Sequence, residues 1–326
     1  MPRLLTVSMV VLALVFGASS SATLAAPTAT ATGVVVVNTR LAYGGGAGAG
    51  TGIILTSSGR VLTNNHVIRG AGSIRVTVPS TGRSYMATVA GYSVSKDVAL
   101  LELRDASGLQ TVQTGNSSTV RVGDRVVAVG NSGGRGLTTK SGRVTGLNQS
   151  ITLSDDGTPF TLPGLIETTA PLRSGDSGGP LLSNGRVIGI DAAASAGAIY
   201  LGSGQGYAIP INRALKIAGQ IDAGRSSSTV HVGPTALLGV GLGRPGDSDV
   251  PGAFVERVAS GSPAAKAGLG ANDVIVAFAG KRVTGPIGLK ALVLRASPGQ
   301  TVRVTWIDPY AGRTSASVRL GEGPPQ

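Results

Sequence analysis

Gly175-Asp176-Ser177-Gly178-Gly179-Pro180-Leu181-Leu182 is the stretch that decides between the folds open to this chain. A serine hydroxyl becomes a strong nucleophile when an imidazole accepts its proton and a carboxylate holds that imidazole in the right tautomer. Glycines beside such a serine allow the backbone bend that aims two amide N–H groups at one point, which forms an oxyanion hole. The stretch therefore predicts Ser177 as a nucleophile, with the amides of Gly175 and Ser177 as the oxyanion hole.

Two chain orders are open for the partners of this serine. The sequence has 2 histidines, so the candidate bases are His66 and His231. His66 with Asp97 gives the order His, Asp, Ser, which is that of chymotrypsin. His231 with Asp222 gives the order Ser, Asp, His, and the residues around Ser177 also match the G-x-S-x-G pattern of α/β-hydrolases.

The residues after the serine separate these orders. An α/β-hydrolase needs a helix directly after its nucleophile. Here two glycines and a proline precede the short apolar run Leu181-Leu182, which disfavours a helix start. His231 lies in residues 226–233, a Ser- and Gly-rich stretch typical of a linker. The first order is therefore favoured.

The surroundings of His66 and Asp97 support the same order. His66 follows the apolar strand-like residues 60–63 through a polar turn, and Asp97 directly precedes the apolar run 98–103. A strand beside each residue would fix its position next to the nucleophile. We therefore predict His66, Asp97 and Ser177 as the catalytic residues.

These blocks resemble those of the HtrA/Deg serine proteases. The likeness rests on residues 63–67, 97–101 and 174–181, and it continues through 50–55, 122–131 and 206–210. It implies two six-stranded β-barrels with the triad in the cleft between them, and polypeptides as the substrates. Short apolar runs separated by Gly, Ser, Asn and Asp turns predict a mainly β chain independently. One helix is expected after Pro210, where apolar residues from Ile211 to Ile221 recur at helical spacing.

The composition changes after residue 233. Residues 253–258 predict a strand, 262–268 a short helix capped by Ser262, and 287–295 a longer helix. This order resembles a small α+β PDZ domain, in which the amides of Leu238, Gly239 and Val240 would bind the carboxylate of a peptide C-terminus. The predicted organisation is a signal peptide with a flexible N-terminus (1–31), a trypsin-like domain (32–222), a linker (223–233) and a PDZ domain (234–321).

The N-terminus indicates export. Arg3 is followed by an apolar run, residues 4–16, and then by a stretch rich in Ala, Ser and Thr, as in a secretory signal peptide. The run is short for a membrane span, so no stable membrane anchor is expected. We predict a secreted, periplasmic or cell-envelope location.

Charge and composition argue against other partners. The net charge is +12, but the basic residues are scattered and aromatic residues make up 3%, so no nucleic-acid partner is expected. The chain has no cysteine and its two histidines are far apart, so neither a metal site nor a cofactor is predicted. Whether the chain forms a homo-oligomer is left open.

The expected primary specificity pocket lacks a charge at its base. In trypsin-like enzymes an acidic residue six positions before the serine selects Lys or Arg, and here that position is Pro171. The strand expected to line the pocket continues through Ala192, Ala193 and Ala194. These residues predict cleavage after aliphatic side chains. Asp191 weakens this prediction, because its carboxylate would change the preference if it faced the pocket.

Asp176 departs from the family pattern, which usually has Asn before the serine. In trypsin-like zymogens this aspartate pairs with a new N-terminus freed by cleavage. No Ile-Val-Gly-Gly-like activation segment lies upstream, so Arg173 is a candidate partner instead.

Three function classes remain. The favoured class is an exported serine endopeptidase that acts in protein quality control or processing, with a domain that binds peptide C-termini. The others are a non-proteolytic, chaperone-like peptide-binding protein and a secreted serine esterase.

Overall fold

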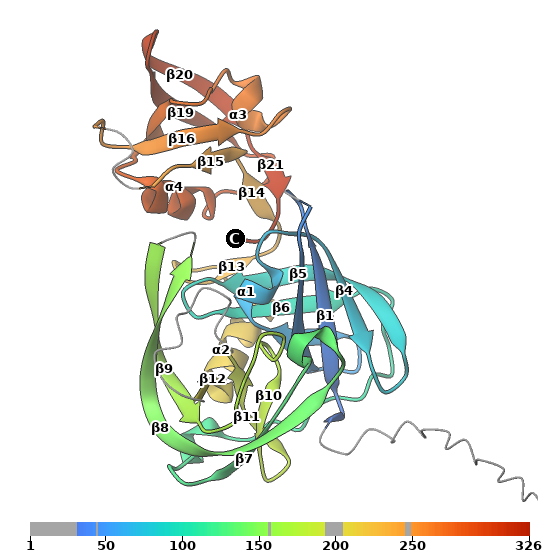
Figure 1. Ribbon diagram of the computed structural model, residues 1–326. Helices are drawn as coiled ribbons and strands as arrows, with labels where there is room; N and C mark the ends of the chain where they lie inside the picture. The colour runs from blue at the N-terminus through green and yellow to red at the C-terminus, as the bar shows by residue number, and fades with distance from the viewer. Residues whose placement is uncertain (1–30, 44, 156–157, 193–204, 245–248) are drawn as a thin grey trace, which may run out of the picture.

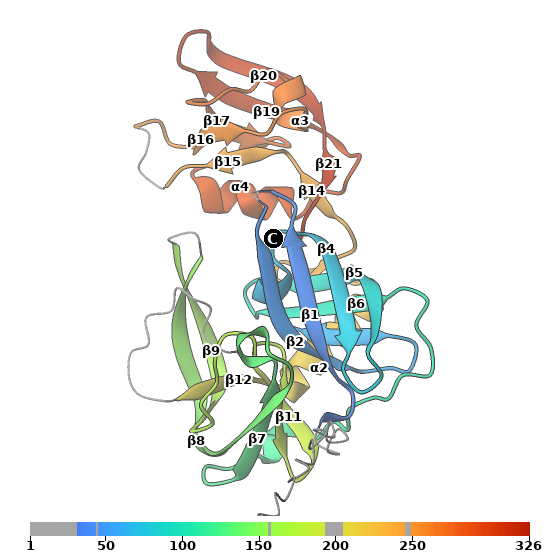
Figure 2. The ribbon, with the colours of Figure 1, turned by 45° about the vertical axis from the view of Figure 1, so that its right-hand side comes forward.

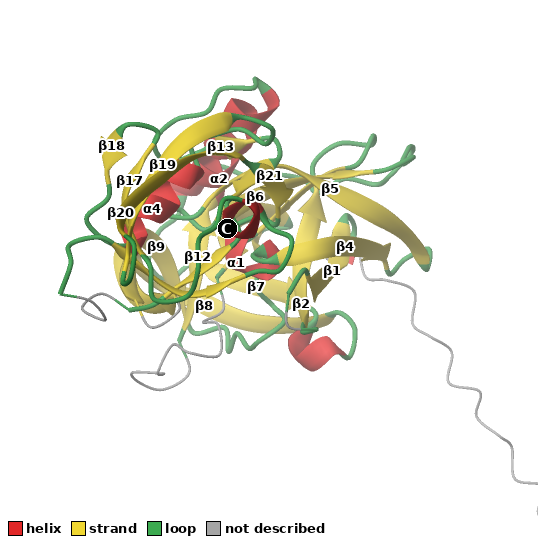
Figure 3. Ribbon diagram, turned by 90° about the horizontal axis from the view of Figure 1, so that it is seen from above, coloured by secondary structure: helices red, strands yellow, loops and turns green. Residues whose placement is uncertain are grey.

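The fold is mainly β. A computed structural model describes residues 31–43, 45–155, 158–192, 205–244 and 249–326, so the expected signal peptide lies outside the described residues apart from its final position. Seen from above, strands far outnumber helices (Figure 3). This confirms the mainly β prediction.

Six strands of the N-terminal half form a closed ring. Their order is β5, β4, β1, β2, β3, β6, and β6 returns to pair with β5, all antiparallel. The completely buried side chains of Val35, Val37 and Leu101 lie in the core of this ring. The strands are β1 (Val34–Leu41), β2 (Ala47–Ile54), β3 (Arg60–Thr63), β4 (Ala71–Val78), β5 (Arg83–Ser93) and β6 (Val98–Leu103).

A second set of six strands forms a closed barrel. Their order is β10, β11, β12, β9, β8, β7, and the hairpin of β8 and β9 extends beyond the barrel wall (Figure 1). Leu181 and Ala208 are completely buried inside it. The elements are the 3-10 turn η2 (Ser117–Thr119), β7 (Arg125–Gly130), the 3-10 turn η3 (Ser132–Gly134), β8 (Thr138–Asp155), β9 (Thr158–Thr168), β10 (Pro180–Ser183), β11 (Arg186–Asp191) and β12 (Gly206–Pro210).

Helix α2 (Ile211–Asp222) joins the ring to the barrel. One continuous apolar cluster contains Ile53 from the ring, Ile190 from the barrel and the buried face of α2. That face repeats at helical spacing, as the sequence predicts, and consists of Ile211, Ala214, Ile217, Ala218 and Ile221. The two β units are therefore held together by a shared core.

The C-terminal unit has its own core around Trp306, Phe278 and Leu289. Helix α3 begins at Pro263, and the Oγ of Ser262 accepts a 3.2 Å hydrogen bond from the Ala265 N–H, the predicted cap. Helix α4 begins one residue before the predicted helix 287–295 and ends two residues before its end. The elements are β14 (Thr235–Leu237), β15 (Val240–Leu242), β16 (Ala253–Val258), α3 (Pro263–Lys266), β17 (Val274–Phe278), β18 (Lys281–Arg282), α4 (Pro286–Val293), β19 (Thr301–Asp308), β20 (Gly312–Arg319) and β21 (Gly321–Gly323).

The segment expected as a linker is partly ordered as a strand. Strand β13 (His231–Val232) pairs with Tyr92 and Gly91 of β5 and so extends the ring. The sequence missed it because a two-residue strand has no detectable alternation. Its position is fixed by β5.

The end of the chain lies between the C-terminal unit and the ring in both views (Figures 1 and 2), and Figure 1 shows it close to the short helix α1 (Asn65–Ile68). Strand β21 pairs with β14, after which the carbonyl of Pro325 accepts a 2.8 Å hydrogen bond from the Gly70 N–H. The Asn65 side chain donates to the carbonyl of Gln326 at 3.0 Å.

None of the helices in the described ranges has the length and apolar character to cross a membrane.

Candidate active site

His66 is held at the end of a buried strand. It follows β3 as the second residue of α1, and the neighbouring Val67 and Ile68 are buried in the core of the ring. These apolar anchors fix the short helix, whereas the His66 side chain remains 24% exposed. The imidazole is therefore positioned by the core and open to a substrate.

Asp97 holds both the backbone and the ring of His66. Its Oδ2 lies 2.8 Å from His66 Nδ1, and its Oδ1 accepts a 2.9 Å hydrogen bond from the His66 backbone N–H. The Asn64 side chain donates to the carbonyl of Asp97 at 2.9 Å. Because a carboxylate only accepts hydrogen bonds, this contact places the ring proton on Nδ1 and leaves Nε2 as the basic nitrogen.

Strand β2 lies between the His66 segment and the Ser177 turn. The Thr51 N–H donates to the Ser177 carbonyl at 2.8 Å, and the Thr63 hydroxyl donates to the Thr51 carbonyl at 2.7 Å. A Cβ on Gly50 would lie 2.7 Å from Val67 and 3.1 Å from the Ser177 carbonyl. The structure thus brings the Ser177 turn against the strand and helix that carry His66.

Two glycines are needed for the bend around Ser177. Gly175 has φ +96° and Gly178 has φ +85°, in the left-handed region that favours glycine. A Cβ on Gly175 would lie 2.2 Å from the Asn131 carbonyl oxygen, and one on Gly178 would lie 2.0 Å from the Thr51 carbonyl oxygen. The bend predicted from the sequence is present, and the oxyanion role of the Gly175 and Ser177 amides stays a prediction.

The partner of Asp176 is Lys140. The Lys140 Nζ lies 2.6 Å from Asp176 Oδ2, and the Ser132 hydroxyl donates to Oδ1 at 2.7 Å. Arg173, the candidate from the sequence, contributes its backbone N–H at 2.7 Å. Sequence reasoning missed Lys140, which lies 36 positions upstream without any motif around it.

Asp191 is completely buried, and neither of its carboxylate oxygens has a hydrogen-bond partner among the described residues. Burial, followed by the nearby charge of Asp176, raises the pKa of Asp191 well above its usual range, and Lys140 partly offsets this rise. Of the residues predicted to line the specificity pocket, Ala192 is buried and Pro171 is exposed. The other two, Ala193 and Ala194, lie outside the described residues.

The order Ser, Asp, His finds no support in the geometry. Asp222 forms an ion pair with Arg60 at 2.9 Å. The ring nitrogens of His231 face the carbonyl oxygens of Leu294 at 3.0 Å and Pro234 at 3.2 Å. The residues after Ser177 form a turn and a strand instead of a helix.

The predicted carboxylate loop lies at a sheet edge of the C-terminal unit. Leu238 is buried, and Gly239 has φ +86°, with the side chain of Ser262 packed against it. Val240 begins β15, which pairs with β16 and forms one end of the sheet. A peptide strand could therefore be added along β15.

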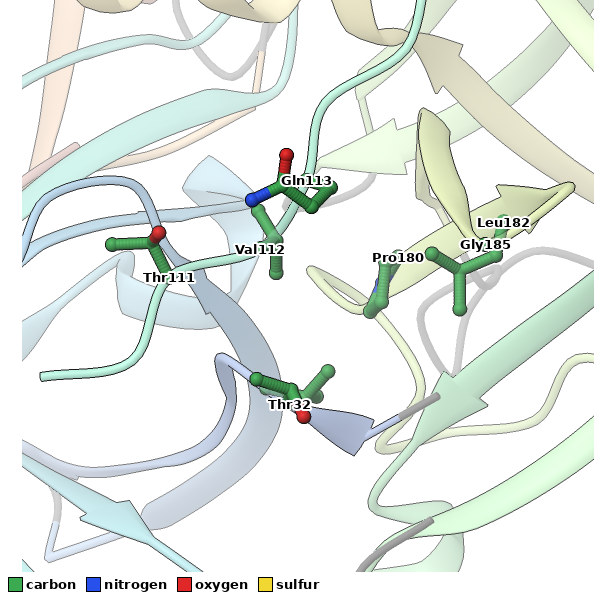
Figure 4. A pocket seen from close by; sticks show the side chains of 8 residues that line it. Thr32, Thr111, Val112, Gln113, Pro180, Leu182 and Gly185 are labelled. Carbon is green, nitrogen blue, oxygen red and sulfur yellow. The ribbon is translucent and has the colours of Figure 1, made fainter. Parts of the chain in front are cut away.

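One pocket in the described part of the chain is lined by none of the three triad residues. It lies where the start of β1, the segment before η2 and β10 meet (Figure 4), and it offers no titratable side chain. Its lining consists of Thr32, Val34, Thr111, Val112, Gln113, Pro180, Leu182 and Gly185. Within the described ranges no group of three or more His, Cys, Asp or Glu side chains could hold a metal ion.

Comparison with known proteins gives a family for each of the two domains. Residues 50–190 match the family of trypsin-like peptidase domains, and residues 236–307 match the PDZ domain family. The chain is 32% identical over 287 residues to the serine protease PepD of Mycobacterium tuberculosis. The aligned region covers 83% of this chain and 60% of PepD. It is 37% identical over 258 residues to the periplasmic pH-dependent serine endoprotease DegQ of Escherichia coli, which covers 77% of this chain and 54% of DegQ.

Solved structures extend the likeness over almost the whole chain. The HtrA-type protease AlgW with a tripeptide has a TM-score of 0.52 and 26% identity, with 92% of this chain and 99% of that chain covered. AlgW with a decapeptide has a TM-score of 0.50 and 25% identity, with 91% and 97% covered. The chain spans somewhat more than half the length of PepD and DegQ. It belongs to the HtrA/Deg family of serine proteases, with a trypsin-like domain followed by a PDZ domain.

Proposed function

We propose that this protein is an exported serine endopeptidase that cleaves unfolded or exposed polypeptide segments. The observation that carries the proposal is the double contact of Asp97 with the ring and backbone of His66, beside the glycine-bent turn of Ser177. In this assignment Ser177 is the nucleophile, His66 the general base and Asp97 the group that orients the base. The amides of Gly175 and Ser177 form the oxyanion hole.

The proposed reaction follows from these positions. The Nε2 atom of His66 accepts the proton of Ser177 as Oγ attacks the carbonyl carbon of the substrate. The oxyanion hole stabilises the negative charge that develops on the carbonyl oxygen, and protonated His66 then gives its proton to the leaving amine. Water then attacks the acyl carbon as His66 Nε2 accepts its proton, and this proton passes to Ser177 Oγ as the ester bond breaks.

The C-terminal unit, in this proposal, binds the free C-terminus of a peptide. The proposed boundaries are residues 32–222 for the protease domain and 234–321 for the PDZ domain. The edge position of β15 supports the assignment, as do the related AlgW structures with peptides. The periplasmic location of DegQ supports export, and its endoprotease activity is compatible with the proposed role in protein quality control or processing.

Labelling with a fluorophosphonate, followed by digestion of casein, tests the proposed activity. We expect the wild-type chain to be labelled and to digest casein, and Ser177→Ala to do neither. Labelling without digestion would favour an esterase. Absence of both in a folded wild-type protein that still binds unfolded casein would favour a chaperone-like binding protein.

The peptide site is tested separately in the full-length Ser177→Ala variant, which cannot cleave the ligand. We expect a peptide that ends in Val to bind with a Kd of about 1–100 μM, and its amidated twin to bind far more weakly. Equal binding of the two peptides would show that Leu238, Gly239 and Val240 do not form a carboxylate site.

A further inference from the structure

The side chain of Asp176 lies in a closed set of hydrogen bonds. Asp176 is completely buried, and Lys140 is 13% exposed at its side chain. The Lys140 Nζ lies 2.6 Å from Oδ2 and also contacts the Ser132 hydroxyl, which donates to Oδ1 at 2.7 Å. The Arg173 N–H donates to Oδ2 at 2.7 Å. A buried carboxylate of this kind requires a cation, because its water of hydration is lost.

Further hydrogen bonds join the turn of residues 173–179, here called the serine turn, to the residues that follow β7 and to Thr51 of β2. The Gly133 N–H donates to the carbonyl of Ser174 at 3.0 Å. The Thr51 hydroxyl donates to the Gly175 carbonyl at 2.7 Å and accepts from the Asn131 N–H at 2.9 Å. The position of the turn therefore depends on side chains that lie outside it.

The residue directly after Asp176 is Ser177, so a rotation of the Asp176 backbone would move the amides of the proposed oxyanion hole. Oxyanion donors act only when they lie about 2.7–3.1 Å from the position of the developing charge, so a small shift of the turn would weaken them. In proteases that are activated by cleavage, a freed N-terminal ammonium supplies the cation for this aspartate, and the sequence has no such segment. Here an ammonium on β8 already occupies that place.

We propose that Lys140 is a positioning residue that replaces a cleaved N-terminus, so that the serine turn is held in its catalytic conformation in the uncut chain. The inference rests on the proposed protease function. In this role Lys140 acts through Asp176, with which it forms an ion pair. Asp191 is an acidic group near this pair; burial and the charge of Asp176 raise the pKa of its carboxyl, which disfavours a second negative charge beside Lys140.

The test compares four full-length proteins with the wild type. Lys140→Met removes the ammonium but keeps the length of the side chain, and Asp176→Asn removes the carboxylate. The double variant Lys140→Met with Asp176→Asn removes both charges, so no unbalanced charge stays buried. Arg60→Met is the matched control, because it removes ion pairs with Glu102 and Asp222 that lie away from the serine turn.

We expect Lys140→Met to lower kcat on a short fluorogenic peptide by about 10²-fold or more, with KM changed by less than about 3-fold. The double variant should recover most of this loss, and Arg60→Met should keep kcat near the wild-type value. A merely structural role would give no recovery in the double variant. Unchanged kcat in folded Lys140→Met, or a double variant no more active than Lys140→Met, would overturn the proposal.

Hydrogen exchange gives a readout that does not depend on turnover. The amides of Asp176, Gly178 and Gly179 are hydrogen-bonded within or beside the serine turn and should be protected in the wild type. They should exchange at least about 10-fold faster in Lys140→Met and regain protection in the double variant. If the wild type is inactive but the variants show this exchange pattern, the protease function is refuted and the positioning role of Lys140 stands. If the wild type is active but exchange is the same in Lys140→Met as in the wild type, only the positioning role of Lys140 is refuted.

Discussion

Asp97 contacts His66 twice: its Oδ2 lies 2.8 Å from the ring Nδ1, and its Oδ1 accepts a 2.9 Å hydrogen bond from the backbone N–H. The carboxylate therefore fixes both the rotation of the ring and its tautomer. Replacing it with an amide would keep the shape of the side chain but would no longer impose the proton on Nδ1.

Asp97→Asn should thus lower kcat/KM by about 10⁴-fold, and Ser177→Ala and His66→Ala by at least as much. Double changes should add little, because the three residues act as a unit. Steady-state rates on a peptide substrate give the measurement. A large loss in His231→Ala together with a small loss in His66→Ala would contradict the assignment.

Asp191 makes stability depend on pH. A carboxyl whose pKa is raised by folding binds a proton more tightly in the folded chain, so its contribution to stability is present below its ordinary pKa and falls as pH rises toward the folded value. Asp191→Asn removes the ionisation. At about pH 8 we expect the variant to have a higher Tm and a free energy of unfolding larger by about 1 kcal/mol or more. At about pH 4 we expect little difference between the two proteins.

Calorimetry of both proteins at the two pH values provides the comparison. Ala192→Gly, at the buried position directly after β11, controls for general loosening of this segment and should shift Tm equally at both pH values. An Asp191→Asn effect of the same size at both pH values would contradict the argument.

His231 should matter for stability and not for catalysis. Its ring lies 5.0 Å from that of Tyr92, and its nitrogens face the carbonyl oxygens of Pro234 and of Leu294 in the C-terminal unit. His231→Ala should leave kcat on a small peptide within about 2-fold and lower the free energy of unfolding by about 1–2 kcal/mol. Urea unfolding in a Ser177→Ala background avoids self-digestion. An unchanged midpoint would show that these contacts contribute nothing.

Cleavage specificity should favour aliphatic residues. Pro171 offers no charge, and the carboxyl of Asp191 is completely buried, with its pKa raised. We expect a peptide library to be cleaved mainly after Val, Ala or Leu, because the side chain then gains from apolar burial. Lys or Arg as the main residue before the cut would mean that Asp191 faces the substrate in its ionised form.

Much of the fold could be predicted because its signals are local. The apolar run 98–103 forms β6 with those bounds, and the spacing of Ile211, Ala214, Ala218 and Ile221 forms α2. The serine turn could also be predicted, because its glycines indicate a backbone conformation that other residues rarely adopt. Alternation, helical spacing and turn glycines are properties of neighbours in the chain.

The tertiary structure alone decided which distant groups meet. Nothing near Lys140 in the sequence marks it as the cation for Asp176. The two residues are 36 positions apart, and the register of the barrel strands brings them into contact. Likewise, His231 lies in a stretch that reads as a linker, and only β5 gives it a strand to pair with. Sequence periodicity reports which face of an element is buried. The partner of a single buried charge depends on how those faces are brought together, and that is a property of the whole fold.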